Sequence, residues 1–291
     1  MAKLELRYTL SKSDEETRAR IERVAKQSLS KLDPHVRAVL FLRGACGRAA
    51  LCHSNFYIYL GAEISTEDEL RSWQPAHRLR HYALRHSSIN TIAIGARSIY
   101  DHARKGDLNA KSVTTLSKCE FAKAVAYWAN GNPEKESMAR LALTLIQRVL
   151  VRCAVSIGAA KQSSCLLTRR IAFMKAYADR QAAHVSLANY EYTSLDVAHV
   201  VAVTAVLGAM IHEFDGRTDR GTTWLDAMDK AAYDAGTEMF PALKRLPRLF
   251  DQCDLDNMFK VICEGKLTDG PEYLSTWLPS ALGWDGPTKP I

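Results

Sequence analysis

The chain has 291 residues, of which 47% are apolar and 24% are charged, and this usage is that of an ordinary globular protein. Such a length can bury one large or two medium hydrophobic cores, and we expect two domains. Positive charge is concentrated in the first third: residues 1–106 contain 18 Lys/Arg and 11 Asp/Glu, whereas residues 107–291 contain 21 of each. This imbalance favours phosphate-bearing partners for the first third.

The apolar runs and the cysteines argue against a membrane-spanning or secreted chain. The most apolar run, Val197 to Ile211, is about 15 residues long, short of the roughly 20 that cross a bilayer, so we predict a buried helix and no membrane partner. The seven cysteines are Cys46, Cys52, Cys119, Cys153, Cys165, Cys253 and Cys263. Their number is odd and they form no close pairs, which predicts reduced thiols and a cytoplasmic protein.

The predicted elements of the first part alternate between strands and helices. Residues 3–10 alternate apolar and polar side chains as a half-buried strand does, and we expect no leader peptide there. A capping box at residues 13–16 begins a helix that ends at Asp33-Pro34. The elements that follow are strands at Val36–Leu42, Phe56–Leu60 and Ile89–Ile94, a helical turn at 65–69 and a helix at 75–86.

From about residue 96 onward the pattern is that of long helices, with Asn130-Gly131-Asn132-Pro133 as the clearest break. The predicted helices are 97–105, 107–129, 133–160, 163–187, 194–213, 222–238 and 254–265, followed by an irregular packed tail from residue 268. The sequence therefore predicts an α+β protein. A small mixed β-sheet domain at 1–116 would precede an α-helical bundle at 117–291.

Two short motifs lie at the junction of the predicted strands 36–42 and 56–60: the glycine turn itself, and a motif that begins shortly before the second strand. The turn reads Leu42-Arg43-Gly44-Ala45-Cys46-Gly47, and Ser54-Asn55-Phe56-Tyr57 follows it. In order and spacing they resemble the DNA polymerase β-type nucleotidyltransferase superfamily, in which Gly-Ser-x-Ala-x-Gly precedes Ser-Asp-x-Asp. Minimal nucleotidyltransferases and antibiotic adenylyltransferases share the chain order, and the likeness spans residues 13–130. The resemblance implies a nucleotidyltransferase-like domain with a site for a nucleoside triphosphate.

The resemblance also places neutral side chains where that family has metal-binding carboxylates. These positions are Asn55, Tyr57, and either Asn90 or Thr91. Magnesium ions that bridge a triphosphate need charged oxygen ligands, which an amide and a protonated phenol do not supply. We therefore expect a noncatalytic protein, a pseudo-nucleotidyltransferase without catalytic residues, metal or cofactor.

Six residues are predicted to contact a phosphate-bearing ligand through backbone amides of the turn and arginine side chains. They are Arg43, Gly44, Gly47, Ser54, Arg78 and Arg80. A dense basic cluster within residues 71–97, interleaved with Trp73 and Tyr82, favours contact with a nucleic acid or nucleotide. Its basic members are Arg71, His77, Arg78, Arg80, His81, Arg85, His86 and Arg97. The alternative is a solvated helical face whose arginines pair with nearby acids.

Other interpretations stay open. An active nucleotidyltransferase would take its carboxylates from outside the motif, for example from Glu63 or Glu67. A structural subunit of a viral or other multiprotein assembly would keep the fold without the ligand. The wide apolar stripe at 139–160 is core, or else a surface for a second copy or a protein partner. His199 and His212 are predicted to be core or cap residues.

Overall fold

The computed structural model describes residues 34–64, 74–100, 118–137, 139–140, 166–179, 194–214 and 221–251. Most of these residues are helical, and none of them lies in a strand. The elements are α2 (Pro34–Ile64), α4 (Pro75–Tyr100), α5 (Lys118–Ala129), α8 (Leu166–Tyr177), α9 (Ser194–Phe214), α10 (Gly221–Met239) and the 3-10 helix η3 (Pro241–Arg245).

The predicted α+β fold with a mixed β-sheet is therefore wrong for the part of the chain that the structure describes. Val36–Leu42 and Phe56–Leu60 both lie inside α2, and Ile89–Ile94 lies inside α4. The β-branched and aromatic side chains of these runs have only a weak intrinsic preference for strands, which tertiary packing overrides. The burial pattern of α2 is helical, since its buried positions recur every three or four residues: Val39, Leu42, Ala45, Ala49, Cys52 and Phe56.

The predicted helical bundle is confirmed within the described ranges. α9 and α10 agree with the helices predicted at 194–213 and 222–238 to within one residue at each end. Asn130 and Gly131 form the predicted break, with positive φ angles of 45° and 79°. The helix predicted from Pro75 is longer than expected, because it continues to Tyr100. The strand predicted at 3–10, the helices predicted at 13–33 and 254–265, the tail and the domain boundary at 116/117 lie outside the described residues.

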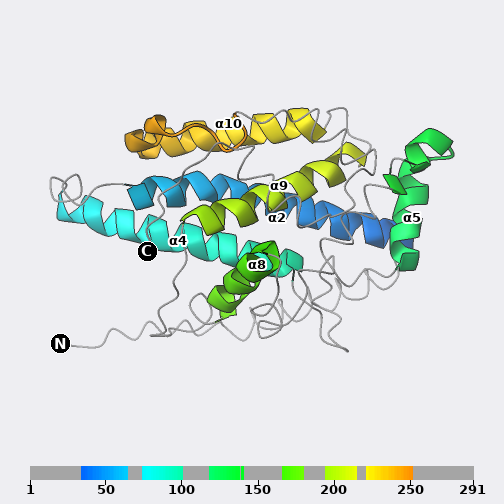
Figure 1. The fold of residues 1–291 in the computed structure, drawn as a ribbon, viewed down its shortest axis with the longest axis horizontal. Helices are drawn as coiled ribbons and strands as arrows, with labels where there is room; N and C mark the ends of the chain where they lie inside the picture. Colours follow the sequence, from blue (N-terminus) through cyan, green and yellow to red (C-terminus); the bar gives the residue numbers. More distant parts are fainter. Residues whose placement is uncertain are drawn as a thin grey trace, which may run out of the picture.

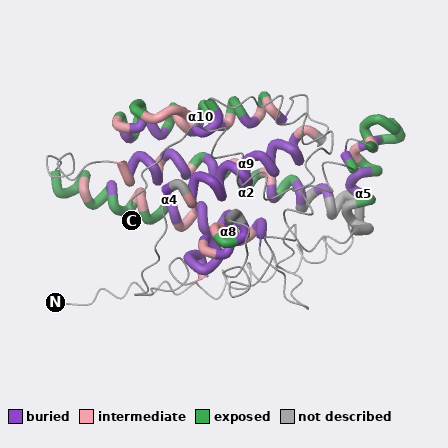
Figure 2. Tube along the Cα trace, in the orientation of Figure 1, coloured by how far each residue is buried: buried purple, intermediate pink, exposed green. Residues whose placement is uncertain are grey.

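The central helix is α2, which contacts α4, α5, α9 and α10 (Figure 1). α8 lies against α4 and α9, on the side of the molecule away from α10 (Figure 1). Every residue of α9 from Val197 to His212 is buried, so the predicted buried helix is confirmed (Figure 2). The window Asp196–Glu213 passes a length and composition test for crossing a membrane, but 89% of it is covered by the rest of the protein, as in a core helix.

Glycines allow the helices to approach α2 closely at two crossings. A Cβ atom on Gly236 of α10 would lie 2.7 Å from the Cβ of Tyr57, and one on Gly208 of α9 would lie 2.9 Å from the Cβ of Ala49. Both distances are shorter than van der Waals contact, so a larger residue does not fit without a shift. The backbone of α10 is thereby held against α2, with Tyr57 at the contact.

Candidate functional site

The predicted phosphate-binding turn is a stretch of α2. Gly44 and Gly47 lie within a 31-residue helix, where backbone N–H groups bond to carbonyl groups four residues earlier. These amides are therefore not available to a phosphate. The side chains of Arg43 and Ser54 are exposed on the same helix, and the Ser54 hydroxyl donates to the Leu51 carbonyl at 3.0 Å.

The three positions of the lost carboxylates do not converge. Residues two apart on a helix point in nearly opposite directions, about 200° apart, whereas on a strand they would share a face. Tyr57 accordingly points into the core toward α10, while Asn55 is partly exposed and donates to the Leu51 carbonyl at 2.9 Å. Asn90 is partly exposed on α4. A helix thus separates side chains that the predicted strand would have gathered.

The predicted basic cluster is partly paired with acids. Arg85 donates to Glu63 at 2.6 Å, and Arg97 forms an ion pair with Asp179. Glu63, one of the two carboxylates suggested for an active enzyme, is therefore already paired with Arg85. The other, Glu67, lies outside the described residues. For Arg85 and Arg97, these ion pairs support the alternative of a helical face whose arginines pair with nearby acids.

Four further members of the cluster lie near the start of α4, and His86 is exposed farther along the same helix. Arg80 and His77 are exposed, Arg78 is half-buried, and the buried His81 places its Nε2 2.7 Å from the Ala62 carbonyl. Arg71 and Trp73 lie outside the described residues.

The six predicted ligand residues fall into two separate groups. The contact between His81 and Ala62 places the start of α4 beside the end of α2. Arg43 is 19 residues from Ala62 on the same helix, which corresponds to about 28 Å along the axis. Arg43 and Arg80 therefore cannot bind one small ligand together. That either group binds a ligand by itself stays a prediction.

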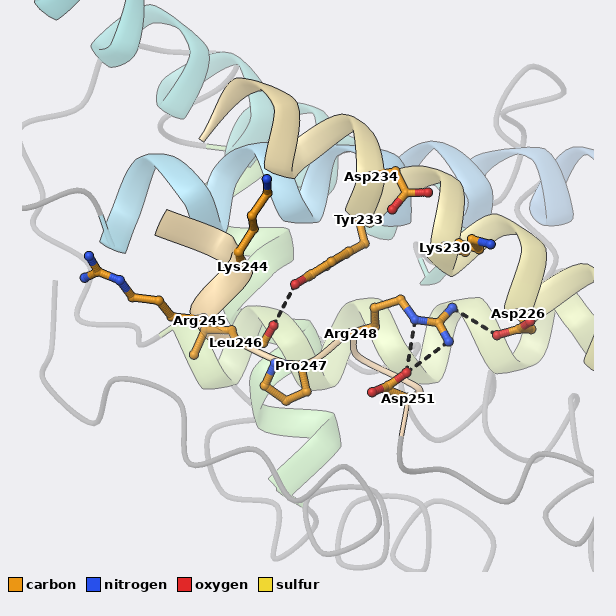
Figure 3. Close-up of a pocket in the computed structure, with 10 residues that line it drawn as sticks. All are labelled: Asp226, Lys230, Tyr233, Asp234, Lys244, Arg245, Leu246, Pro247, Arg248 and Asp251. Atoms are coloured by element: carbon orange, nitrogen blue, oxygen red, sulfur yellow. Dashed lines mark hydrogen bonds and ion pairs between the residues drawn. The ribbon is translucent and has the colours of Figure 1, made fainter. Parts of the chain in front are cut away.

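An open groove of about 610 Å³ lies between α10 and the segment that follows it (Figure 3). The chain reverses at Phe240, so residues 241–251 run back along α10 and form the second wall. The α10 wall is lined by Asp226, Lys230, Tyr233 and Asp234, and the other wall by Lys244, Arg245, Leu246, Pro247, Arg248 and Asp251. The lining has four basic and three acidic side chains, a formal net charge of +1.

Arg248 binds two of the three acids. Its Nη1 donates to Asp226 at 3.0 Å, and its Nε and Nη2 donate to one oxygen of Asp251 at 3.2 and 3.0 Å (Figure 3). Burial alone would lower the pKa of this guanidinium, but the hydrogen bonds to Asp251 and Asp226 and the charge of Asp229 hold the pKa above its ordinary value. Arg248 is thus a fixed cation that ties the second wall to α10.

The other cations of the groove have no acidic partner in the part of the chain that the structure describes. Lys230, Lys244 and Arg245 are exposed, and they form no ion pair or side-chain hydrogen bond with any residue of the described part. Asp234 is the remaining acid of the lining, and it is likewise exposed and unpaired among the described residues. The groups available to a ligand are therefore three cations, placed on both walls, and one carboxylate.

Tyr233 forms part of the floor and joins the two walls. Its hydroxyl lies 2.9 Å from the Leu246 carbonyl (Figure 3). It also lies 3.3 Å from the Leu243 carbonyl, and it can donate to either. Burial, followed by the negative charges of Asp251 and Asp234, raises the pKa of this phenol. Tyr233 therefore stays protonated and keeps its donor role.

A buried polar network lies beneath the groove and holds residues 249–250. Asp229 is completely buried, and its Oδ1 accepts from the Tyr57 hydroxyl at 2.6 Å and lies 2.8 Å from His53 Nε2. Its Oδ2 accepts from the Phe250 amide at 3.3 Å, and the Tyr57 oxygen accepts from the Leu249 amide at 2.6 Å. A buried carboxylate is costly unless several donors satisfy it, and here three do so.

The network keeps the phenol of Tyr57 protonated. Burial, and then the charge and hydrogen bond of Asp229, raise the pKa of Tyr57 well above its ordinary value, so the phenol remains a donor. The contact with Asp229 is made by His53 Nε2, and the buried Nδ1 has no hydrogen-bond partner among the described residues. The His53 ring stacks on Phe250 at 5.8 Å between ring centroids. The second wall of the groove is thus anchored in the core by side chains of α2 and α10.

The groove was not predicted from the sequence, although a signal for it exists. In Leu243-Lys244-Arg245-Leu246-Pro247-Arg248, three basic residues fall within five positions beside a proline that cannot continue a helix. Lys230, in contrast, belongs to an ordinary amphipathic helix. Only the reversal of the chain at Phe240 brings it to the same groove as Lys244 and Arg245.

No protein-family model, curated protein or solved structure matches the chain. The resemblance to nucleotidyltransferases thus depends on two short motifs, and the strands that they require are helices here. Within the described ranges, no group of three or more His, Cys, Asp or Glu side chains is placed to hold a metal ion.

Proposed function

We propose that this helical protein is a noncatalytic binding protein that holds a phosphate-bearing ligand in the groove between α10 and residues 241–251. One observation carries the proposal. Lys230, Lys244 and Arg245 surround a groove of about 610 Å³ and have no acidic partner among the described residues. Unpaired cations on two facing walls attract a ligand with several negative charges.

The types of side chain favour phosphate over a single carboxylate. Arginine offers a planar fork that matches two phosphate oxygens, and lysine supplies a compact point charge. The cations lie on both walls and are spread along the groove, with Arg245 pointing away from Lys230 (Figure 3), so an extended chain of phosphates reaches more of them than a single phosphate does. Each exposed ion pair contributes only about 0–1 kcal/mol, so we expect moderate affinity that falls as salt rises.

Isothermal titration calorimetry with inorganic tripolyphosphate tests this function, with EDTA present and at about 0.1 M salt, where the Debye length is about 10 Å. The test variant is Lys244→Glu combined with Arg245→Glu. The matched control is Lys135→Glu combined with Arg169→Glu, which reverses two exposed cations elsewhere on the molecule. We expect the wild type and the control to bind and the test variant to lose binding.

The opposite results would overturn the proposal. If the wild-type protein does not bind tripolyphosphate, the groove is not a phosphate site. If the test variant and the control lose affinity equally, the binding follows net charge rather than the groove. Circular dichroism of each variant shows that the helices are intact, and a lower salt concentration must strengthen the wild-type binding.

A further inference from the structure

A second hollow, of about 380 Å³, lies between the start of α4 and the end of α10. Its volume is at the lower end of the range of small-molecule pockets, about 300–1,000 Å³, and suits one flat ring system. The α4 wall has His77, Arg80, His81 and Leu84, and the α10 end has Glu238, Met239 and Phe240.

The floor of this hollow is rigid. Phe240 is buried and lies so close to the backbone of α2 that a Cβ on Gly61 would be 2.6 Å from the Phe240 Cβ. His81 is fixed by its hydrogen bond to the Ala62 carbonyl, and its ring meets that of Phe240 edge to face at 5.9 Å. An apolar ligand ring therefore meets a preformed aromatic surface.

The rim carries a donor on one wall and an acceptor on the other. Arg80 and Glu238 are both exposed, and neither forms an ion pair with a described residue, although both line the same hollow. A ligand that fits this arrangement offers hydrogen-bond acceptors toward the guanidinium and an amino or imino donor toward the carboxylate. Together with the aromatic floor, these requirements describe a nucleobase.

The hollow adjoins the phosphate groove. Asp234 in the groove and Glu238 in the hollow are one helical turn apart, about 6 Å along α10. Lys244 and Arg245 follow the floor residue Phe240 by only four and five positions. The base and the phosphates of one nucleotide can therefore reach the hollow and the groove together.

We infer that the hollow is the base subsite for a free purine nucleoside polyphosphate, with guanine preferred; this inference rests on the proposed phosphate-binding function. Guanine presents two acceptors, O6 and N7, to an arginine and has an amino donor for a carboxylate, whereas adenine presents one acceptor to the arginine. Uracil has no exocyclic amino group for Glu238. The hollow has room for one base beside the cations, as a free nucleotide requires, whereas a nucleic-acid strand binds over a series of stacking surfaces.

Titration calorimetry with guanosine, adenosine and uridine triphosphates and with tripolyphosphate, all with EDTA, tests the inference. We expect guanosine triphosphate to bind about tenfold tighter than uridine triphosphate or tripolyphosphate, with adenosine triphosphate between them. Glu238→Gln should remove this preference and leave tripolyphosphate affinity unchanged. Glu134→Gln, a matched change of an exposed glutamate in the helical residues 133–137, should preserve the preference.

The results separate this inference from the proposed function. Equal binding of all three nucleotides and tripolyphosphate would overturn the base subsite and leave the phosphate groove standing. Absence of tripolyphosphate binding would overturn the proposed function itself. A short oligoguanylate RNA that binds tighter than guanosine triphosphate would contradict the assignment to a free nucleotide, and unchanged selectivity in Glu238→Gln would contradict the role of Glu238.

Discussion

The hydroxyl of Tyr57 on α2 donates to Oδ1 of Asp229 on α10 across 2.6 Å, with both side chains buried. The same hydroxyl oxygen accepts from the amide of Leu249. One phenol thus links the central helix, the helix that forms one wall of the groove and the segment that forms the other wall. The position and shape of the groove depend on this link.

Replacing Tyr57 by phenylalanine should destabilise the protein by about 1–3 kcal/mol, because it leaves the Leu249 amide and part of the Asp229 carboxylate unsatisfied in the core. Urea unfolding followed by circular dichroism measures the change. Hydrogen exchange should also be faster at the Leu249 amide. Tyr82→Phe is the control, since Tyr82 is 51% exposed, and a similar loss of stability in that variant would contradict the role of the network.

Gly44 and Gly47 should tolerate alanine, whereas Gly236 should not. A Cβ on Gly47 would meet no atom within 4 Å, and a Cβ on Gly44 would lie 3.7 Å from the Arg48 guanidinium. In an exposed helix interior each change to alanine should raise the free energy of unfolding by about 0.5–1 kcal/mol. Gly236→Ala should lower it by about 1–3 kcal/mol because of the contact with Tyr57. Destabilisation by Gly44→Ala and Gly47→Ala would support the turn predicted from the sequence.

The free energy of unfolding should fall steeply above about pH 9. Burial raises the pKa of the Cys52 thiol from 9.0 to about 12. It also raises the pKa of the Tyr57 and Tyr59 phenols above their ordinary 10.0. The folded protein thus retains protons that the unfolded chain releases, so each group contributes stability that is complete below its unfolded pKa and is lost as the pH rises toward its folded pKa. The slope is about 1.4 kcal/mol per pH unit for each group.

Urea unfolding at a series of pH values from about 7 to about 11 measures this loss. Tyr59→Phe removes one of the titrating groups, so its slope above pH 10 should be shallower than that of the wild type. A free energy of unfolding that stays constant over this range would contradict the burial of these groups. The Cys52 thiol should also resist alkylation near neutral pH until the protein unfolds.

The charge of Asp234 should weaken the binding of anions in the groove. This carboxylate is the one acid of the lining without a partner among the described residues, and it lines the same groove as Lys230. Asp234→Asn should therefore raise the affinity for tripolyphosphate about twofold to fivefold, the effect of one exposed charge. Glu134→Gln, which neutralises an exposed acid outside the groove, is the control. An unchanged affinity in Asp234→Asn would place the ligand elsewhere.

The sequence predicted the later helices well because their signals are local and agree with each other. α9 is apolar over most of its length, and the break at Asn130-Gly131 contains residues that adopt positive φ readily. The fold class was wrong for the earlier part, because Gly44 and Gly47 in α2 suggested a turn. A helical pattern of buried residues from Val39 to Phe56 runs past both glycines, and it was the stronger signal.

The groove and the hollow depend on contacts that no local pattern contains. Asp229 and Tyr57 are 172 residues apart, and Glu238 and Arg80 line one hollow only because α10 ends beside the start of α4. Of the six residues predicted to contact a ligand, Arg80 lines the hollow, and the other five line neither the groove nor the hollow. Its exposure follows from its place in the first turns of α4, whereas the ion pairs of Arg85 and Arg97 could not be inferred without the tertiary structure.

The binding of phosphate between α10 and residues 241–251 is tested most directly by nuclear magnetic resonance of the labelled protein during titration with tripolyphosphate. We predict saturable shifts of the Lys230, Lys244 and Arg245 resonances, with those of Arg43 and Ser54 on α2 unchanged. Shifts confined to α2, or no saturable shift at residues 230 and 244–245, would contradict the proposed site.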